Sequence, residues 1–269
     1  MNIINPLIVA RKSLYFSVSA IDKVQGKTLN GPVLFCYHSF SDDNWLHGVS
    51  VDEFEKQMRF LTTNYKQASI SQIEKLIKGE KLDLKNFFLI TIDDGYKDVL
   101  NVRKIIAKYK IKPILFLLAD RNNLNRKEMD NNKKLLSDSE IKLLAKDGWY
   151  IGSHGSTHSD FYKLSAQDQV YEIIESKKNI EKIINKKINF FAYPKGRFTD
   201  EIIKTVKKAK YTLAFSMDDG FINGKTNPYI IPRIGVNRTH SMSEFKQMIS
   251  PMVVRVRGYI KTNIKGLTI

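Results

Sequence analysis

One apolar segment that ends in two adjacent carboxylates constrains the fold of this chain most strongly. Residues 87–92 are apolar or β-branched, and Asp93, Asp94 and Gly95 follow them directly. The run predicts a buried strand, and acids at its end would lie at the rim of a sheet, where β/α enzymes carry their chemistry. Because neighbouring strand residues point to opposite faces, the two acids are free to have different tasks. The alternative is a turn in which both acids cap the following helix.

A second short apolar run ends in histidines. Residues 149–153 lead into His154 and His158, which are two of only five histidines in the chain. A spacing of four lets both imidazoles reach one point if the backbone turns helically. Two imidazoles and one carboxylate suit a catalytic zinc-type ion that keeps a position open for water.

Strand-like and helix-like segments alternate through the middle of the chain. We expect strands at residues 33–37, 87–92, 113–118, 149–153, 189–192, 212–215 and 229–234. We expect helices at residues 51–65, 71–78, 96–109, 139–146, 166–184, 200–209 and 243–249, and a long exposed loop at 120–137. Such alternation predicts parallel strands with crossover helices. A doubly wound sheet is the alternative, but a barrel is favoured because it brings the ends of several strands to one mouth.

Three motifs, in this order and spacing, resemble those of polysaccharide deacetylases, the NodB-type superfamily of carbohydrate esterase family 4. They are residues 91–95, 153–158 and 190–196, and the resemblance covers roughly residues 31–250. It implies a single-domain α/β fold, a distorted (β/α)7 barrel over 31–250. A helical N-terminal extension at 1–30 and a basic C-terminal helix at 251–269 would flank it.

The resemblance also implies roles for four of these side chains. Asp94, His154 and His158 match the family's metal ligands, and Asp93 matches its catalytic base. The cofactor would be a divalent metal, with Zn²⁺ expected first and Ni²⁺, Co²⁺ or Mn²⁺ as alternatives. An alternative for Asp93 is to orient His154 as a partner behind the metal.

The third motif departs from the family pattern at two positions. Tyr193 and Pro194 would build one wall of the site, but Lys195 stands where an aromatic residue is usual. A backbone N–H there can still hold an oxyanion, and the lysine side chain could meet an anionic group on the substrate. Ala192 replaces the family's usual arginine. Arg233 is the candidate replacement, pairing with Asp93 or the substrate, unless it forms a surface salt bridge.

The general acid is assigned by the same resemblance. The family's late Leu-x-His motif has no convincing copy, and His240 lies in polar surroundings. His38 ends the apolar run 33–37, which resembles the poly-N-acetylglucosamine deacetylase branch, where the motifs are permuted. We therefore expect His38 to be the acid, with His240 or a structural His38 as alternatives. Trp45, in a loop with His47, would rim the cleft and stack on a sugar face.

The net charge of +16 favours nucleic acid, anionic membrane or anionic glycan as a partner. No nucleic-acid-binding module is visible, so we expect no nucleic-acid partner. Apolar residues recur at helical spacing near both ends of the chain, at Leu7, Ala10, Leu14, Val18 and Ile21, and at Val253, Val256, Ile260, Ile264 and Leu267. We expect both helices to pack on the barrel. The alternative is a peripheral contact with an anionic membrane.

The location of the protein is predicted from three sequence features. Cys36, the one cysteine, excludes an internal disulfide framework. Residues 1–10 lack a signal-peptide pattern, and no stretch has the roughly 20 apolar residues of a membrane span. We expect a cytoplasmic protein that works at the inner face of the membrane.

Together these features predict a metal-dependent hydrolase that removes N-acetyl groups from N-acetylated amino sugars of a polysaccharide or cell-envelope glycan. One alternative is a deacylase or deformylase of a lipid-linked or nucleotide-linked sugar precursor. The other is a non-catalytic glycan-binding protein. The intact set Asp93, Asp94, His154 and His158 argues against the latter.

Overall fold

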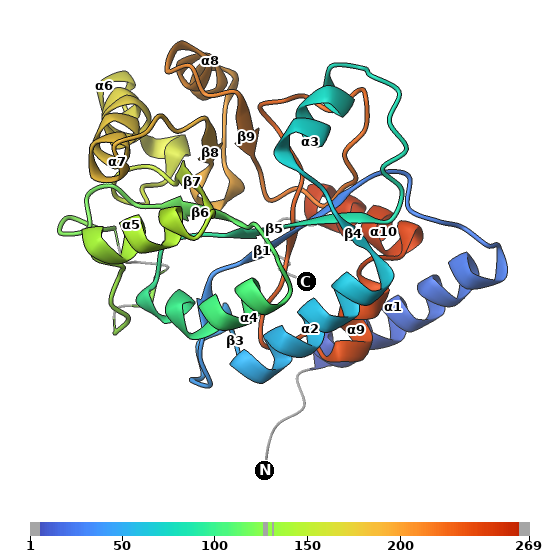
Figure 1. Cartoon of the computed structure of the whole chain (residues 1–269). Helices are drawn as coiled ribbons and strands as arrows, with labels where there is room; N and C mark the ends of the chain where they lie inside the picture. The colour runs from blue at the N-terminus through green and yellow to red at the C-terminus, as the bar shows by residue number, and fades with distance from the viewer. Residues whose placement is uncertain (1–5, 126–128, 131, 264–269) are drawn as a thin grey trace.

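The computed structural model describes residues 6–125, 129–130 and 132–263. A curled sheet of parallel strands forms its centre, and helices surround it (Figure 1). The strand order is β10 (Ile234–Gly235), β1 (Val33–Tyr37), β5 (Phe87–Ile92), β6 (Ile114–Leu117), β7 (Tyr150–Ser153), β8 (Phe190–Ala192) and β9 (Leu213–Phe215). The short β4 (Lys66–Gln67) also pairs with β5. This arrangement confirms the distorted seven-stranded barrel predicted from the sequence.

Helices connect the strands. They are α2 (Val51–Asn64), α3 (Ile70–Ile77), α4 (Arg103–Lys108), α5 (Asp138–Lys146), α6 (Ala166–Val170), α7 (Ser176–Ile184) and α8 (Asp200–Lys208), and α9 (Met242–Gln247) follows the last strand. A 3-10 helix, Lys97–Val102, precedes α4, and a π-helical segment, Tyr171–Glu175, joins α6 to α7. β2 (Ser39–Phe40) and β3 (Gly48–Val49) form a separate small sheet. Six helices begin at a Ser or Thr side chain that accepts a backbone N–H of the first turn, which satisfies an otherwise unpaired donor: Ser50, Ser69, Ser137, Ser165, Thr199 and Ser241.

Both faces of the sheet are buried. Leu34 and Leu89 belong to one apolar cluster, and Phe35 and Ile90, their chain neighbours, belong to the other. This follows from the alternation of side chains along a strand, and burial of both faces is typical of parallel sheets. The strands are therefore apolar throughout, and their polar residues come at their ends.

The last strand differs from the sequence-based expectation. A strand was expected at 229–234, but β10 spans only Ile234–Gly235. Within the described residues Ile231 makes a single bridge to Phe215, and Pro232 follows it directly. Because proline has no N–H to donate to a ladder, a continuous strand cannot run through this position.

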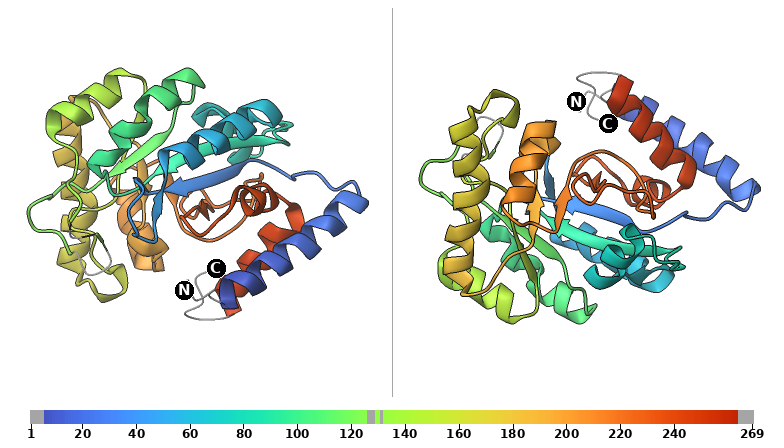
Figure 2. Two further views of the ribbon diagram at one scale, coloured as in Figure 1. Left: turned by 90° about the horizontal axis from the view of Figure 1, so that it is seen from below. Right: turned by 90° about the horizontal axis from the view of Figure 1, so that it is seen from above.

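The terminal helices α1 (Pro6–Val24) and α10 (Pro251–Asn263) lie side by side (Figure 2), and α1 also packs against α9. The orientation of α1 corrects our expectation that its apolar stripe packs on the barrel. Leu7, Leu14 and Ile21 are 61%, 37% and 43% exposed, whereas Arg11 and Asp22 are buried.

The physical reason is that the polar residues of α1 have partners in the protein. Arg11 pairs with the buried Glu244 at 2.8 Å, and Asp22 accepts the Met252 N–H at 2.7 Å. In the predicted stripe of α10, Val253 is buried and Val256 and Ile260 are half-buried. Ile264 and Leu267 lie outside the described residues. Of the helices that the structure describes, none combines the length and apolar character needed to cross a membrane.

Candidate active site

The carboxyl ends of the parallel strands meet at a cavity of about 450 Å³. Its lining includes residues that directly follow four of the strands. They are His38 after β1, Asp93 and Asp94 after β5, His154 after β7, and Lys195 and Gly196 in the turn after β8. His158, Trp45 and His47 complete this side of the cavity. The topology therefore brings together residues that lie up to 158 positions apart in the chain.

The turn after β5 separates the two neighbouring aspartates. The Asp93 N–H donates to the Tyr37 carbonyl at 2.9 Å, which extends the β1–β5 ladder by one residue. Asp94 and Gly95 then adopt left-handed φ values of 69° and 74°. A Cβ on Gly95 would lie 2.7 Å from the Leu117 side chain and would displace it, and the left-handed φ also favours glycine here. As a result Asp94 faces the two histidines and Asp93 faces Arg233.

Asp94, His154 and His158 converge on one point. Asp94 Oδ1 lies 3.5 Å from His154 Nε2 and 3.7 Å from His158 Nε2. His154 Nδ1 donates to the Ala192 carbonyl at 2.9 Å, so its Nε2 carries the lone pair. Burial lowers the pKa of both imidazoles, which keeps them neutral as metal ligands must be.

The donor set fits a divalent cation. Asp94 Oδ1 is buried and has no hydrogen-bond partner among the described residues. Burial, and then the charge of Asp93, raise the pKa of Asp94 well above its usual value. A cation between the carboxylate and the two imidazoles would satisfy this oxygen and favour its ionised form.

Glu172 holds the turn that carries the two histidines. Its carboxylate is 2% exposed and accepts the N–H groups of Ser156 and Thr157 at 2.7 and 3.1 Å, and also the Thr157 hydroxyl. Glu172 lies in the π-helical segment Tyr171–Glu175, and such segments recur at functional sites. Sequence analysis did not find this residue, because a glutamate in a lysine-rich helix is usually solvated.

Asp93 forms a buried ion pair with Arg233. The guanidinium Nη1 and Nη2 donate to Asp93 Oδ1 and Oδ2 at 2.7 and 2.8 Å, and Arg233 is fully buried. Burial by itself would raise the pKa of Asp93, but the charge of Arg233 and its hydrogen bonds hold that pKa well below its usual value. Of the two partners expected for Arg233, the structure therefore shows Asp93, and a surface salt bridge is excluded.

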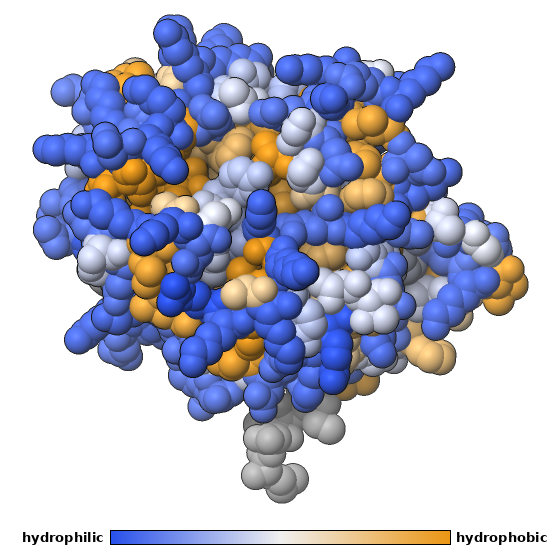
Figure 3. Space-filling view, in the orientation of Figure 1, coloured by the Kyte–Doolittle hydropathy of each residue, from blue (hydrophilic) through white to orange (hydrophobic). Residues whose placement is uncertain are grey.

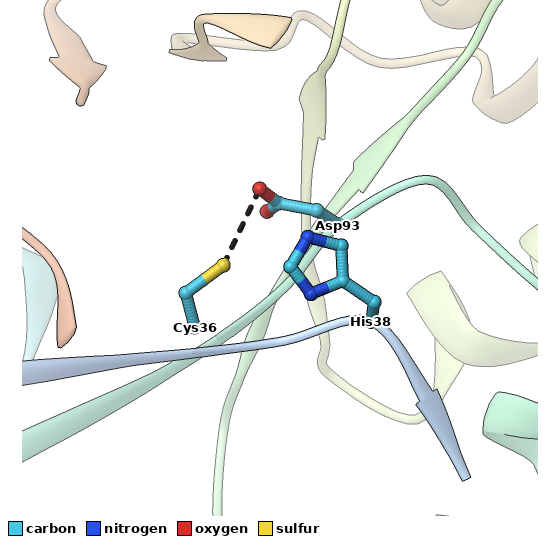
Figure 4. A group of neighbouring side chains, drawn as sticks. All are labelled: Cys36, His38 and Asp93. Atoms are coloured by element: carbon cyan, nitrogen blue, oxygen red, sulfur yellow. Dashed lines mark hydrogen bonds between the residues drawn. The ribbon is translucent and has the colours of Figure 1, made fainter. Parts of the chain in front are cut away.

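Cys36 and His38 lie close to Asp93 (Figure 4). The Cys36 thiol donates to Asp93 Oδ2 at 3.4 Å, and burial raises the pKa of that thiol well above its usual value. These three residues also have the spacing of a metal site. They are less suited to one than Asp94 and the histidines, because the thiol is protonated and both Asp93 oxygens are bound to Arg233.

His38 faces the cavity and His240 does not. Burial, and then the nearby His47, lower the pKa of His38 to about 3, so its imidazole is neutral at pH 7. His240 is 4% exposed, and its Nδ1 accepts the Asn237 N–H at 3.1 Å, away from the lining of the cavity. Of the two candidates for a general acid, only His38 lies beside Asp93.

The remaining expected site residues divide into two groups. Trp45 lines the cavity and packs edge-on against Tyr96, with 5.2 Å between the ring centroids, and Lys195 lines it from a left-handed turn with φ 59°. Tyr193 and Pro194 are buried and are not among the lining residues, and the Tyr193 hydroxyl donates to the Tyr229 carbonyl at 3.0 Å. We therefore assign Tyr193 and Pro194 a supporting role in the wall rather than substrate contact.

The C-terminal helix also contributes to the cavity, which sequence analysis did not anticipate. Arg257 and Lys261, one turn apart on α10, line it together with Met217 and Asp218 from the segment after β9. The expected boundary at residue 250 stays a prediction, but the helix beyond it forms one wall of the site.

A parallel barrel with a carboxylate and two imidazoles converging at its mouth, beside an ion-paired acid, is typical of metal-dependent hydrolases. A sequence model of the polysaccharide deacetylase family matches residues 82–214. The chain belongs to this family of metal-dependent amide hydrolases.

Known proteins similar to this chain support that membership. Bacillus subtilis YxkH is 28% identical over 223 residues, which are 82% of this chain and 76% of YxkH. A Staphylococcus aureus poly-beta-1,6-N-acetyl-D-glucosamine N-deacetylase is 26% identical over 203 residues, 70% of this chain and 67% of that protein. Two solved structures show the same fold. Streptococcus pyogenes deacetylase PplD has a TM-score of 0.70 and 22% identity, and it covers 84% of this chain and 100% of its own. IcaB from Ammonifex degensii has a TM-score of 0.71 and 19% identity, with 84% and 98% covered.

Proposed function

We propose that this protein removes N-acetyl groups from N-acetylated amino sugars of a polysaccharide or cell-envelope glycan. The observation that carries the proposal is the buried set Asp94, His154 and His158 beside the Asp93–Arg233 pair. The N-deacetylase activity named for the Staphylococcus aureus relative supports the same reaction. Trp45, on the lining of the cavity, offers an aromatic face for a sugar ring.

The metal would be held by Asp94 Oδ1 and by Nε2 of both histidines. A divalent cation there would supply a Lewis acid that polarises the acetamide carbonyl and lowers the pKa of water. Zn²⁺ is our first choice, because two imidazoles with one carboxylate is a common catalytic zinc set, and Ni²⁺, Co²⁺ and Mn²⁺ are alternatives.

Asp93 is proposed as the base. The Arg233 guanidinium fixes its orientation and keeps it ionised, so it can accept a proton from the attacking water. The backbone N–H of Lys195, in its left-handed turn on the lining of the cavity, is the proposed donor to the oxyanion of the tetrahedral intermediate.

His38 is proposed to deliver a proton to the leaving amine. One proton leaves the water and one is needed by the amine, so the reaction needs no net proton from the protein. Because His38 is neutral at rest, it can act as an acid only after it has received the proton taken up by Asp93. Figure 4 shows its imidazole turned toward the Asp93 carboxylate, which is consistent with such a relay.

Acetate release across three substrate classes tests the proposed function. The substrates are chitooligosaccharides, β-1,6-linked N-acetylglucosamine oligomers and lipid-linked N-acetyl sugars. We expect acetate from at least one of the first two. Release from the lipid-linked sugar alone would favour the precursor deacylase, and binding of a glycan by the metal-loaded protein without any acetate would favour a binding protein.

A peripheral contact with an anionic membrane is the second proposal, and the outward face of α1 supports it. Leu14, Phe16, Ile21 and Val24 are 37%, 67%, 43% and 88% exposed on this helix. Figure 3 shows apolar atoms at the right-hand edge of the molecule, where α1 lies in Figure 1, besides others on the same face. The single acid of α1, Asp22, is buried. A face of apolar side chains within a protein of net charge +16 suits an anionic lipid surface.

Liposome sedimentation tests this contact. Anionic liposomes should retain the protein at low salt and release much of it at high salt, because salt screens exposed charge. Phe16→Ser should weaken retention, whereas Phe198→Ser, outside α1, should not. Equal recovery with neutral and anionic liposomes would contradict the contact. The cytoplasmic location expected from the sequence stays a prediction.

A further inference from the structure

One wall of the cavity carries three cations that the proposed reaction does not use. Lys195 comes from the turn after β8, and Arg257 and Lys261 come from α10. The proposed metal ligands and base come from the segments that follow β5 and β7.

A buried network fixes the two cations of α10. Arg257 Nε donates to Asp219 Oδ1 at 2.6 Å, and Lys261 Nζ lies 2.5 Å from Asp219 Oδ2. Arg257 Nη1 also donates to the Tyr15 hydroxyl at 2.6 Å, and Lys261 Nζ donates to the Met217 carbonyl at 2.7 Å. The cations therefore occupy fixed positions, which lowers the entropy lost when a ligand binds.

The charges on this wall do not balance. The three cations line the cavity together with one carboxylate, Asp218. The Asp219 carboxylate, whose side chain is fully buried, binds both Arg257 and Lys261. A local excess of positive charge favours an anion at the surface of the cavity.

A purely structural role accounts for part of this network. The bonds of Arg257 to Tyr15 and Asp219 tie α10 to α1 and to the segment after β9. That role does not require Lys261, whose side chain is 25% exposed on the lining of the cavity. It does not require Lys195 on the turn after β8 either.

We propose that Lys195, Arg257 and Lys261 form a subsite for an anionic substituent, a phosphate or carboxylate, on the glycan that carries the acetamido sugar. Ammonium and guanidinium groups make charge-assisted hydrogen bonds to such oxyanions. This proposal rests on the proposed function, which supplies the substrate class. The subsite binds an anionic glycan more tightly than a neutral one.

Binding to the full-length, metal-free protein tests the subsite without requiring turnover. The probes are an N-acetylglucosamine trisaccharide, the same trisaccharide with one phosphate, and the same trisaccharide with one carboxylate. The fluorescence of Trp45 reports binding, since it is the tryptophan on the lining of the cavity and Trp149 is buried elsewhere. We expect at least one anionic probe to bind about tenfold more tightly than the neutral probe at low salt, the scale of one charge-assisted hydrogen bond.

Two variants and one control decide the outcome. Lys261→Met and Lys195→Met should each reduce the ratio of the neutral to the anionic Kd, whereas Lys208→Met, at an exposed position of α8, should keep it. Thermal unfolding would show that all three variants fold. Equal Kd values for the neutral probe and both anionic probes, or a ratio unchanged in both cavity variants, would overturn the subsite. A preserved anion preference without acetate release would instead contradict the proposed function alone.

Discussion

Arg233 binds both carboxylate oxygens of Asp93, at 2.7 and 2.8 Å, in an ion pair whose two side chains are no more than 2% exposed. The pair lies between residues 140 positions apart and joins the ends of β5 and β10. It holds the proposed base ionised and leaves Asp94 free to face the histidines. Charge and geometry at the proposed metal centre therefore depend on Arg233, which is fully buried and not on the lining of the cavity.

Replacing Arg233 with methionine should lower the free energy of unfolding by about 3–5 kcal/mol, because the buried Asp93 carboxylate would lose its counter-charge. Urea unfolding measures the change. The matched control is Arg103→Met, which removes a partly exposed pair with Asp147 and should cost about 0–1 kcal/mol. Adding Asp93→Asn to Arg233→Met should recover part of the loss. A cost for Arg233→Met no larger than that of the control would contradict the importance of the pair.

Glu172→Gln should weaken metal binding by about 10- to 100-fold, the usual effect of losing a group that orients metal ligands. The neutral amide cannot accept both backbone N–H groups and the Thr157 hydroxyl as the carboxylate does. Metal titration by calorimetry measures the affinity. Glu175→Gln, in the same π-helical segment but 40% exposed, is the control and should bind normally. Equal affinity in the two variants would remove the orienting role of Glu172.

His38→Ala should retain fold and metal but lose most of its turnover, since the leaving amine would lack its proton donor. His240→Ala should keep its kcat, because His240 lies outside the lining of the cavity. Steady-state kinetics with metal analysis on both variants measures the difference. Near wild-type kcat in His38→Ala together with an inactive His240→Ala would move the acid role to His240.

His240 should also make the stability depend on pH. Its pKa is well below the usual 6.5 in the folded protein, chiefly because it is buried. As the pH falls below about 6.5, the unfolded chain binds a proton that the folded protein does not, so this residue lowers the stability at acidic pH. His240→Asn should reduce the slope of unfolding free energy against pH by about 1.4 kcal/mol per unit between pH 6 and 5. An unchanged slope would mean that His240 is protonated in the folded state.

The strands and their polar ends could be predicted because their signal is local. The predicted strand at 87–92 has the bounds of β5, since an apolar run closed by Asp93 and Asp94 has no competing periodicity. The residues of the proposed metal site could be predicted for a related reason. They follow strand ends, and parallel strands bring their ends to one edge of the sheet.

Features that depend on distant partners could not be predicted in this way. The apolar spacing of α1 correctly predicted a helix, but it predicted the wrong buried face. Arg11 is buried because it pairs with Glu244, which lies 233 positions away in the chain. The roles of Glu172 and Lys261 depend likewise on contacts that no local pattern reveals. The short β10 reflects Pro232 and a single bridge at Ile231, which only the assembled sheet defines.

The central claim is that Asp94, His154 and His158 hold a catalytic metal while Asp93 moves a proton. The most direct measurement is metal content together with acetate release, in one preparation each, for the wild-type protein, Asp94→Ala and Asp93→Asn. The account predicts about one metal per chain and acetate for the wild type, neither for Asp94→Ala, and retained metal with turnover reduced ~10²-fold or more for Asp93→Asn. Loss of the metal in Asp93→Asn, or wild-type metal content and acetate release in Asp94→Ala, would contradict it.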